Sequence, residues 1–219
     1  MPLQLYGHPF SSYTQKALMA LYENDTPFQF LELSPEHPDI QAEFAQRWPI
    51  KRFPLLVEGD RQVMEATTII EYLDLRHPGR TRLIPANADA ALEVRMMDRF
   101  FDNYIHANVQ KIVFNALRPE ADRDPYGVEE ARGVLETAYA WLHQWMATRE
   151  WAAAGAPSVA DCAAAPCLFY ADWTHEIDRR FSNVRAYRER LLARPSFARC
   201  VEGGRPYRGF FPLGAPDRD

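Results

Sequence analysis

The hydrophobic pattern of residues 1–77 changes several times between the period of a strand and the period of a helix. Short apolar runs predict β-strands at 3–6, 28–33, 55–57 and 62–64. Apolar residues at helical spacing predict helices from Ser11 to the break at Thr26-Pro27, at 40–48 and at 68–76. The predicted order is βαβαββα. Because a helix joins the first two strands, we expect them to be parallel, and the hairpin then adds an antiparallel edge.

The pattern after residue 77 is helical almost throughout. Pro78, Gly79 and Pro85 first interrupt the periodicity and predict a linker over 78–87. The helices predicted beyond the linker cover 88–117, 128–148, 158–173 and 184–193. From Gly203 onward the chain is rich in Gly, Pro and Arg, which is typical of an extended surface arm. The predicted architecture is therefore an α+β domain over 1–77 followed by an all-helical domain over 88–219.

The composition is that of an ordinary globular protein. Of the 219 residues, 47% are hydrophobic and 25% are charged, which excludes a disordered chain. The net charge of −5 argues against nucleic acid or an anionic membrane as a partner, and no apolar run is long enough to span a bilayer. Three cysteines are too few for a disulfide framework, and the first residues lack the pattern of a signal peptide. We therefore expect a cytoplasmic protein.

The junction between the first strand and the first helix carries the first chemical signal, in the segment Gly7-His8-Pro9-Phe10-Ser11-Ser12. The unpaired amides at a helix N-terminus and its partial positive charge stabilise an anion that is placed there. A serine hydroxyl at the same point adds a hydrogen-bond donor. Taken alone, Ser11 or Ser12 is also explained by helix capping, which is the commoner role of serine at this position.

Two further signals lie at Phe53-Pro54 and at Glu65. A proline at the entrance of a buried strand lies at a strand start or in a special turn, because it cannot donate to the ladder. If its peptide bond is cis, the Phe53 N–H and C=O face open space and can pair with a peptide-like ligand. The ordinary alternative is a trans proline at a strand start. Glu65 precedes a helix, where an acidic residue is favourable in any protein.

Five segments, in the same order along the chain, resemble a cytosolic glutathione S-transferase of the bacterial, serine type. They lie at 6–11, 53–54, 65–73, 158–161 and 194–197. The resemblance implies a thioredoxin-like first domain, an all-helical second domain and a homodimer. It also implies glutathione as the co-substrate, a small hydrophobic electrophile as the second substrate, and no metal.

The resemblance also assigns each of the three signals a role toward glutathione. Pro54 corresponds to the family's cis-proline, and Phe53 before it pairs with the cysteinyl backbone of the tripeptide. Glu65 corresponds to the acid that meets the γ-glutamyl amino group. Ser11 corresponds to the serine that donates a hydrogen bond to the sulfur. A donor beside a helix N-terminus favours thiolate over thiol, and the thiolate then attacks an electrophilic carbon.

The chain departs from the family pattern around this site. The family usually has a serine where this chain has Ala66, and that hydroxyl helps to hold the γ-glutamyl carboxylate. A lost hydrogen bond to a charged group costs roughly 1.5–3 kcal/mol unless another group replaces it. The backbone N–H groups of Ala66 and Thr67 remain, and the Thr67 hydroxyl is a candidate replacement. In the altered segment before Pro54, Lys51 or Arg52 is expected to meet a glutathione carboxylate, unless both are solvated loop charges.

The contact to the sulfur and the electrophile pocket have several candidates. Ser12 and Tyr6 are alternatives for the sulfur contact, although Tyr6 lies in an alternating strand and is expected to pack in the core. Candidates for the electrophile pocket are His8, Phe10 and Tyr104, the last of which lies on the first long helix.

Asp98, Asp102 and His106 share one stripe of that long helix, where we expect a solvated or interdomain face and no metal site. The leading hypothesis for the whole chain is a glutathione transferase. One alternative is a non-catalytic binding module with the same fold. Another is a glutathione-dependent isomerase, dehalogenase or etherase, which would share the first domain and differ only in side chains scattered over the helices.

Overall fold

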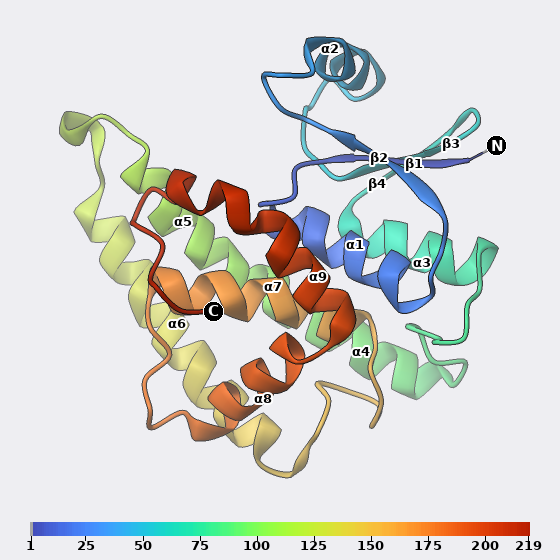
Figure 1. Ribbon diagram of the computed structural model, residues 1–219. Coiled ribbons are helices and arrows are strands. Elements are labelled where there is room, and N and C mark those ends of the chain that lie inside the picture. The colour runs from blue at the N-terminus through green and yellow to red at the C-terminus, as the bar shows by residue number, and fades with distance from the viewer. Residues whose placement is uncertain (1) are drawn as a thin grey trace.

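A computed structural model describes residues 2–219, and its first part is built on one four-stranded sheet (Figure 1). The strands are β1 (Leu3–Gly7), β2 (Phe28–Glu32), β3 (Leu55–Glu58) and β4 (Arg61–Met64), in the order β2-β1-β3-β4. β1 is parallel to β2 and antiparallel to β3, so that Leu5 lies opposite Phe30 on one side and Leu56 on the other. Both strand directions confirm the prediction from the sequence.

Helices cover both faces of this sheet. α1 (Ser12–Glu23) and α3 (Ala66–Arg76) lie together on one face, and α2 (Pro38–Arg47) lies on the other (Figure 1). Alternate residues of a strand pack on opposite faces of the sheet, because successive side chains point in opposite directions. Leu5 and Leu56 belong to the large core, whereas Tyr6 and Leu55 pack with Phe44 of α2.

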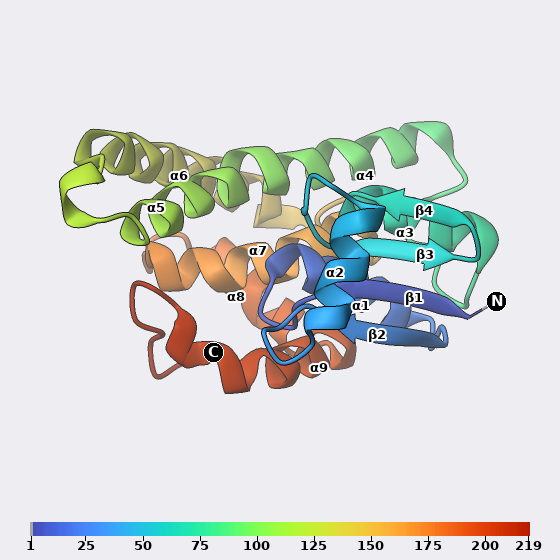
Figure 2. The same ribbon diagram turned by 90° about the horizontal axis from the view of Figure 1, so that it is seen from above.

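The second part of the chain is helical. It contains α4 (Ala88–Phe100), a π-helical segment (Phe101–His106), α5 (Ala107–Ala116), α6 (Pro125–Trp145), α7 (Val159–Thr174), α8 (Ser182–Leu192) and α9 (Pro195–Gly204). Short 3-10 helices lie at Glu120–Asp122, Met146–Thr148 and Arg205–Phe210. α4, the π-helical segment and α5 form one continuous rod in the region where the sequence predicted a helix over 88–117 (Figure 2). The predicted fold class is confirmed, and within residues 2–219 no helix combines the length and hydropathy needed to cross a bilayer.

α7 is the central helix, and every residue from Val159 to Trp173 is buried. A capping box fixes its first turn, with Ser158 and Asp161 bonding reciprocally. α1 packs on α7 and also on α9, so a helix of the first part shares the core of the second part. This packing holds the N-terminus of α1 between the two parts. The division into 1–77 and 88–219 stays a prediction.

The C-terminal region differs from its prediction. The sequence predicted an extended arm from Gly203, but α9 continues to Gly204 and a 3-10 helix follows it. α9 begins at Pro195, whose fixed φ suits the first position of a helix, and it buries Phe197 and Cys200. α9 has only ten residues, and it ends at the two glycines from which the sequence predicted an extended arm.

Candidate active site

One cavity of about 540 Å³ lies between the first part of the chain and the helical part. The polar side chains that line it belong to Ser11, Ser12, Tyr13, Lys51, Arg52, Glu65, His106, Gln110 and Tyr170. Its apolar wall comes from α5 and the C-terminal region, with Val113, Phe114, Leu117, Phe210 and Phe211. The cavity thus joins most of the residues that the sequence selected for glutathione, and it offers a polar end beside an apolar one.

Ser11 is the N-cap residue of α1. Its backbone is extended (φ −87°, ψ 125°), and its Oγ accepts a hydrogen bond from the Thr14 backbone N–H at 3.3 Å. This contact uses only an acceptor position of the hydroxyl, so the Ser11 O–H remains available as a donor. Capping the helix and donating to a ligand are therefore compatible roles for Ser11.

Contacts from the helical part hold the loop that precedes α1. The Tyr170 hydroxyl of α7 donates to the Phe10 carbonyl oxygen at 2.9 Å. The Gln15 side-chain amide donates to the Pro9 carbonyl oxygen at 2.9 Å and to the Tyr170 oxygen at 3.2 Å. The end of α1 is therefore held by both parts of the chain, and its free amides keep one position relative to the cavity.

Ser12 is bonded to a residue that the sequence analysis did not place in the site. Its Oγ lies 2.8 Å from Nε2 of His106, the last residue of the π-helical segment. Burial, with a smaller effect of Lys16, lowers the pKa of His106 to about 4, so the imidazole is neutral at pH 7. The available signal was the four-residue spacing of Asp98, Asp102 and His106, which matches the spacing of Ser12 and Lys16 on the facing helix.

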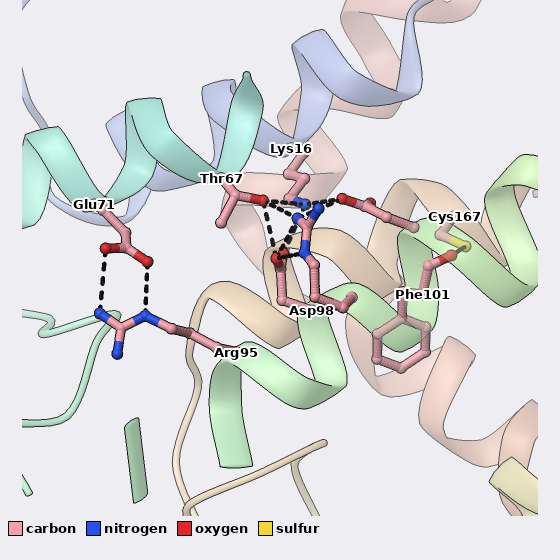
Figure 3. A network of polar contacts seen from close by, with 9 residues as sticks. Lys16, Thr67, Glu71, Arg95, Asp98, Phe101 and Cys167 are labelled. Atoms are coloured by element: carbon pink, nitrogen blue, oxygen red, sulfur yellow. Dashed lines mark hydrogen bonds and ion pairs between the residues drawn. The ribbon is translucent and has the colours of Figure 1, made fainter. Parts of the chain in front are cut away.

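A buried ionic network lies one turn further along α1 (Figure 3). Lys16 Nζ is 2.6 Å from Asp98 and 2.8 Å from Asp102, and the Lys16 and Asp98 side chains are each only 1% exposed. The Thr67 hydroxyl of α3 accepts from Lys16 and donates to Asp98, each at 2.9 Å. Arg99 contacts both carboxylates from the solvent side and is 50% exposed. Of the two faces expected for this stripe, the structure shows the interdomain one.

Thr67 was the candidate to replace the serine hydroxyl that is missing at Ala66, but its side chain belongs to this network. The Thr67 hydroxyl is engaged by Lys16 and Asp98, and Thr67 does not line the cavity. Ala66 does line it and has no hydroxyl. At the start of α3 the remaining donors toward the cavity are therefore backbone N–H groups.

Phe53, Pro54 and Glu65 lie together on the cavity wall. The Phe53–Pro54 peptide bond is cis, which decides between the two forms that the sequence left open. Glu65 is the N-cap of α3 and has a φ of 66°, in the left-handed region that non-glycine residues rarely adopt. Backbone conformations of this kind concentrate at ligand sites, where the surrounding structure enforces them.

Besides Thr67, three candidates from the sequence lie outside the cavity. His8 does not line it: its Nδ1 accepts from the Phe10 N–H at 3.2 Å, and its ring packs on the Tyr207 ring with centroids 4.5 Å apart. Tyr104 is 56% exposed beside Phe100 on the outer side of the rod. Tyr6 is fully buried in the core, as expected. Of the proposed electrophile residues, only Phe10 lines the cavity. Among residues 2–219, no group of His, Cys, Asp or Glu side chains is arranged to hold a metal ion.

Two models of one family match the chain over most of its length. Residues 5–81 match the N-terminal domain of glutathione S-transferase, and residues 125–190 match its C-terminal domain. The chain belongs to the glutathione S-transferase family. The first matched segment of this family member contains the junction before α1, the cis-proline and Glu65.

Individual relatives cover nearly the whole chain. Glutathione S-transferase 3 from Zea mays is 28% identical over 214 residues, which cover 91% of this chain and 93% of that protein. FtsZ-localized protein A from Caulobacter vibrioides is 26% identical over 203 residues, or 88% of each chain. A crystal structure of a glutathione S-transferase from Methylobacterium radiotolerans, in complex with glutathione sulfonate, is similar with a TM-score of 0.79 and 27% identity, covering 92% of this chain and 95% of that one. The thioredoxin-like first domain is thereby confirmed.

Proposed function

We propose that this family member is a glutathione transferase, which forms the glutathione thiolate at the N-terminus of α1 and directs it at a small hydrophobic electrophile. The observation that carries the proposal is the single cavity in which Ser11, the cis-proline and Glu65 face an apolar wall. A charged tripeptide needs the polar end, and an apolar second substrate needs the wall. The related protein from Methylobacterium radiotolerans in complex with glutathione sulfonate supports glutathione as the ligand.

Ser11 is the proposed donor to the sulfur. Its Oγ accepts from the Thr14 N–H, and its O–H donates to the thiolate. The partial positive charge of the helix end acts in the same direction, so both effects lower the pKa of the thiol. A hydrogen bond to a charged group contributes about 1.5–3 kcal/mol, and one pKa unit corresponds to about 1.4 kcal/mol. Ser11 therefore accounts for a lowering of about one to two units.

The rest of the tripeptide is held at the polar end of the cavity. The Phe53 backbone N–H and C=O pair with the cysteinyl backbone in the manner of an added strand. The Glu65 carboxylate receives the γ-glutamyl amino group, and the backbone N–H of Ala66 faces the γ-glutamyl carboxylate at the start of α3. Lys51 or Arg52, both exposed at the cavity, meets the remaining carboxylate.

The second substrate occupies the apolar end. Phe10 forms the floor beside the sulfur, and Phe114, Leu117 and Phe210 form the rim, where they are 47%, 64% and 75% exposed. Aromatic and aliphatic side chains with this exposure bind an apolar compound and bury it only in part. A small hydrophobic electrophile is the substrate class that suits this wall.

The proposed assembly is a homodimer. α4 and the π-helical segment expose Leu92, Met96 and Tyr104 on the outer side of the rod, at 67%, 47% and 56%. Trp141 of α6 is 42% exposed and packs on Phe100 with ring centroids 4.6 Å apart. Contiguous apolar side chains on a protein surface mark a protein contact, and we assign this face to a second copy of the chain.

The proposed location is the cytoplasm, where buried cysteines stay reduced.

Ser11→Ala and Ser11→Gly together test the proposal. Both variants lose the hydroxyl, but alanine at an N-cap costs about 1 kcal/mol of stability and glycine only a few tenths. Both are expected to raise the pKa of the bound glutathione thiol by about one to two units, and to slow chlorodinitrobenzene conjugation about 10- to 100-fold at neutral pH. Only Ser11→Ala is expected to lower the Tm. Calorimetry that shows no glutathione binding at millimolar concentrations would refute the proposal.

The alternative is a family member that binds a ligand without conjugating it. Ala66 favours this alternative, because the Thr67 hydroxyl is engaged elsewhere and one contact to the γ-glutamyl carboxylate is missing. The relative FtsZ-localized protein A is named for a location and not for a reaction. Glutathione binding together with turnover that disappears in Ser11→Ala excludes this alternative.

Isomerisation, dehalogenation and ether cleavage would use the same thiolate, and product analysis with one substrate of each type distinguishes them.

A further inference from the structure

Ser12 and His106 form a polar pair inside the cavity, beside the proposed position of the sulfur. Ser12 is the first residue of α1, and its Oγ lies 2.8 Å from His106 Nε2. His106 is 4% exposed, and its ring packs edge-on against the Tyr13 ring with centroids 4.7 Å apart. Both residues line the same cavity as Ser11 and Glu65. The imidazole is therefore held in place while one of its nitrogens reaches Ser12.

The hydrogen on the imidazole decides where the Ser12 hydroxyl points. His106 is neutral at pH 7 because burial lowers its pKa to about 4, so only one ring nitrogen carries a hydrogen. Within residues 2–219, no group forms a hydrogen bond with its buried Nδ1. A hydrogen on Nδ1 would bury an unpaired N–H donor, which folded proteins avoid more strictly than an unpaired acceptor. The hydrogen therefore lies on Nε2, which donates to Ser12 Oγ.

A serine oxygen that accepts a hydrogen bond keeps its own hydrogen for another partner. The same arrangement occurs at Ser11, whose Oγ accepts from the Thr14 N–H. At both serines a fixed donor of the protein occupies an acceptor position of the hydroxyl. Both O–H groups are consequently free to donate to an anion in the cavity. If the imidazole instead accepted from Ser12, the Ser12 hydroxyl hydrogen would be bonded to the imidazole and could not donate to the ligand.

We propose that His106 is a positioning residue, which holds Ser12 Oγ through Nε2–H so that the Ser12 hydroxyl donates a second hydrogen bond to the glutathione thiolate. This inference rests on the proposed function. His106 acts through Ser12 and does not touch the sulfur. The groups that act on the imidazole are the Ser12 hydroxyl, the Tyr13 ring and the Lys16 ammonium.

The test measures the pKa of the bound glutathione thiol from its ultraviolet thiolate absorbance across a pH series. His106→Leu and Asn108→Leu form a matched pair, because both residues are 4% exposed and lie two positions apart on the rod. Asn108 donates to the Tyr104 carbonyl oxygen and does not line the cavity. His106→Leu is expected to raise the thiol pKa by about one unit. At pH values below the wild-type pKa, the fraction of thiolate then falls about tenfold. Asn108→Leu is expected to leave the thiol pKa unchanged.

Two further variants separate positioning from a general structural role. Ser12→Ala is expected to raise the thiol pKa by a similar amount. The double variant Ser12→Ala/His106→Leu is expected to raise it by no more than either single variant, because the two residues act as one unit. His106→Gln, whose amide N–H lies near the place of Nε2–H, is expected to restore most of the wild-type pKa. Should His106→Leu fail to fold, Ser12→Ala and His106→Gln still give these readouts.

The inference is overturned if the His106→Leu or the Ser12→Ala variant binds glutathione with the same thiol pKa as the wild-type protein. A double variant whose shift equals the sum of the two single shifts also overturns it, because the residues would then act independently. These outcomes leave the proposed function intact as long as the wild-type protein lowers the pKa of bound glutathione. A wild-type protein that binds glutathione without lowering its thiol pKa would overturn the proposed function, and this inference with it.

Discussion

Replacement of Lys16 by methionine tests how much the buried network between the two parts of the chain stabilises the fold (Figure 3). Lys16 is 1% exposed, and its Nζ lies within 2.9 Å of Asp98, Asp102 and Thr67. Methionine keeps the apolar stem and removes the charge. The two carboxylates then share Arg99 alone, so one buried negative charge has no cation.

Removing one partner of a buried ion pair costs about 3–5 kcal/mol, because the remaining charge stays desolvated. At about 2–4 °C per kcal/mol for a chain of this size, the Tm is expected to fall by about 6–20 °C. Arg99→Met is the matched control, because it removes a charge from the same two carboxylates. Arg99 is 50% exposed and water can take its place, so its loss is expected to cost about 1 kcal/mol or less. Adding Asp98→Asn to Lys16→Met removes the unpaired charge and is expected to recover most of the stability.

The pH dependence gives this prediction a second test. Burial raises the pKa of Asp102 and the Lys16 ammonium opposes that shift, so the Asp102 pKa rises further in Lys16→Met. A carboxyl whose pKa is higher in the folded state than in the unfolded state adds stability as the pH falls through the raised value. The difference between wild type and Lys16→Met in urea unfolding, followed by circular dichroism, is therefore largest at neutral pH and shrinks in acid. Equal losses for Lys16→Met and Arg99→Met, or a difference independent of pH, would refute the reasoning.

Two further substitutions test the proposed ligand and the proposed dimer. Ala66→Ser returns a hydroxyl to the cavity at the start of α3 and is expected to tighten glutathione binding about tenfold or more. An unchanged Kd in calorimetry would mean that position 66 does not face the γ-glutamyl carboxylate. Trp141→Glu places a charge on the exposed apolar face and is expected to give a monomer in light scattering, whereas Tyr126→Glu, at the far end of α6, leaves the mass unchanged. A dimeric Trp141→Glu variant would assign the interface to another face.

The fold was predictable where its determinants are local. A short helix between two short strands makes the strands parallel, and the hairpin turn at Gly59 makes the next pair antiparallel. Periodicity and turn residues were therefore enough for the strands and their directions, but not for the strand order. The start of α7 was marked by Ser158 and Asp161, which form the capping box. α9 has a proline at its start but no side-chain cap, it has only ten residues, and it packs on α1 and α8.

The two ends of the cavity were unequally predictable for the same reason. The polar end, which we propose binds glutathione, is built from segments that directly precede a helix or a strand. Each is visible in the sequence as a short segment around Ser11, Pro54 or Glu65. The apolar end exists only once α5 and the C-terminal region pack around α7. Phe114 and Phe210 lie far apart along the chain, and no local pattern marks either of them as a lining residue.

The π-helical segment explains why His106 reaches α1. Asp98, Asp102 and His106 are four residues apart, and in a regular α-helix four residues exceed one turn by about 40°, so His106 would have rotated by about 80° from Asp98. The segment Phe101–His106 holds more residues in each turn, because its hydrogen bonds run over five residues, and this reduces the rotation between Asp102 and His106. His106 thus stays on the side where Asp102 pairs with Lys16, and it meets Ser12 one turn nearer the helix end. The four-residue spacing is visible in the sequence, but a regular helix would turn His106 away from α1, so the contact itself follows only from the irregular turn.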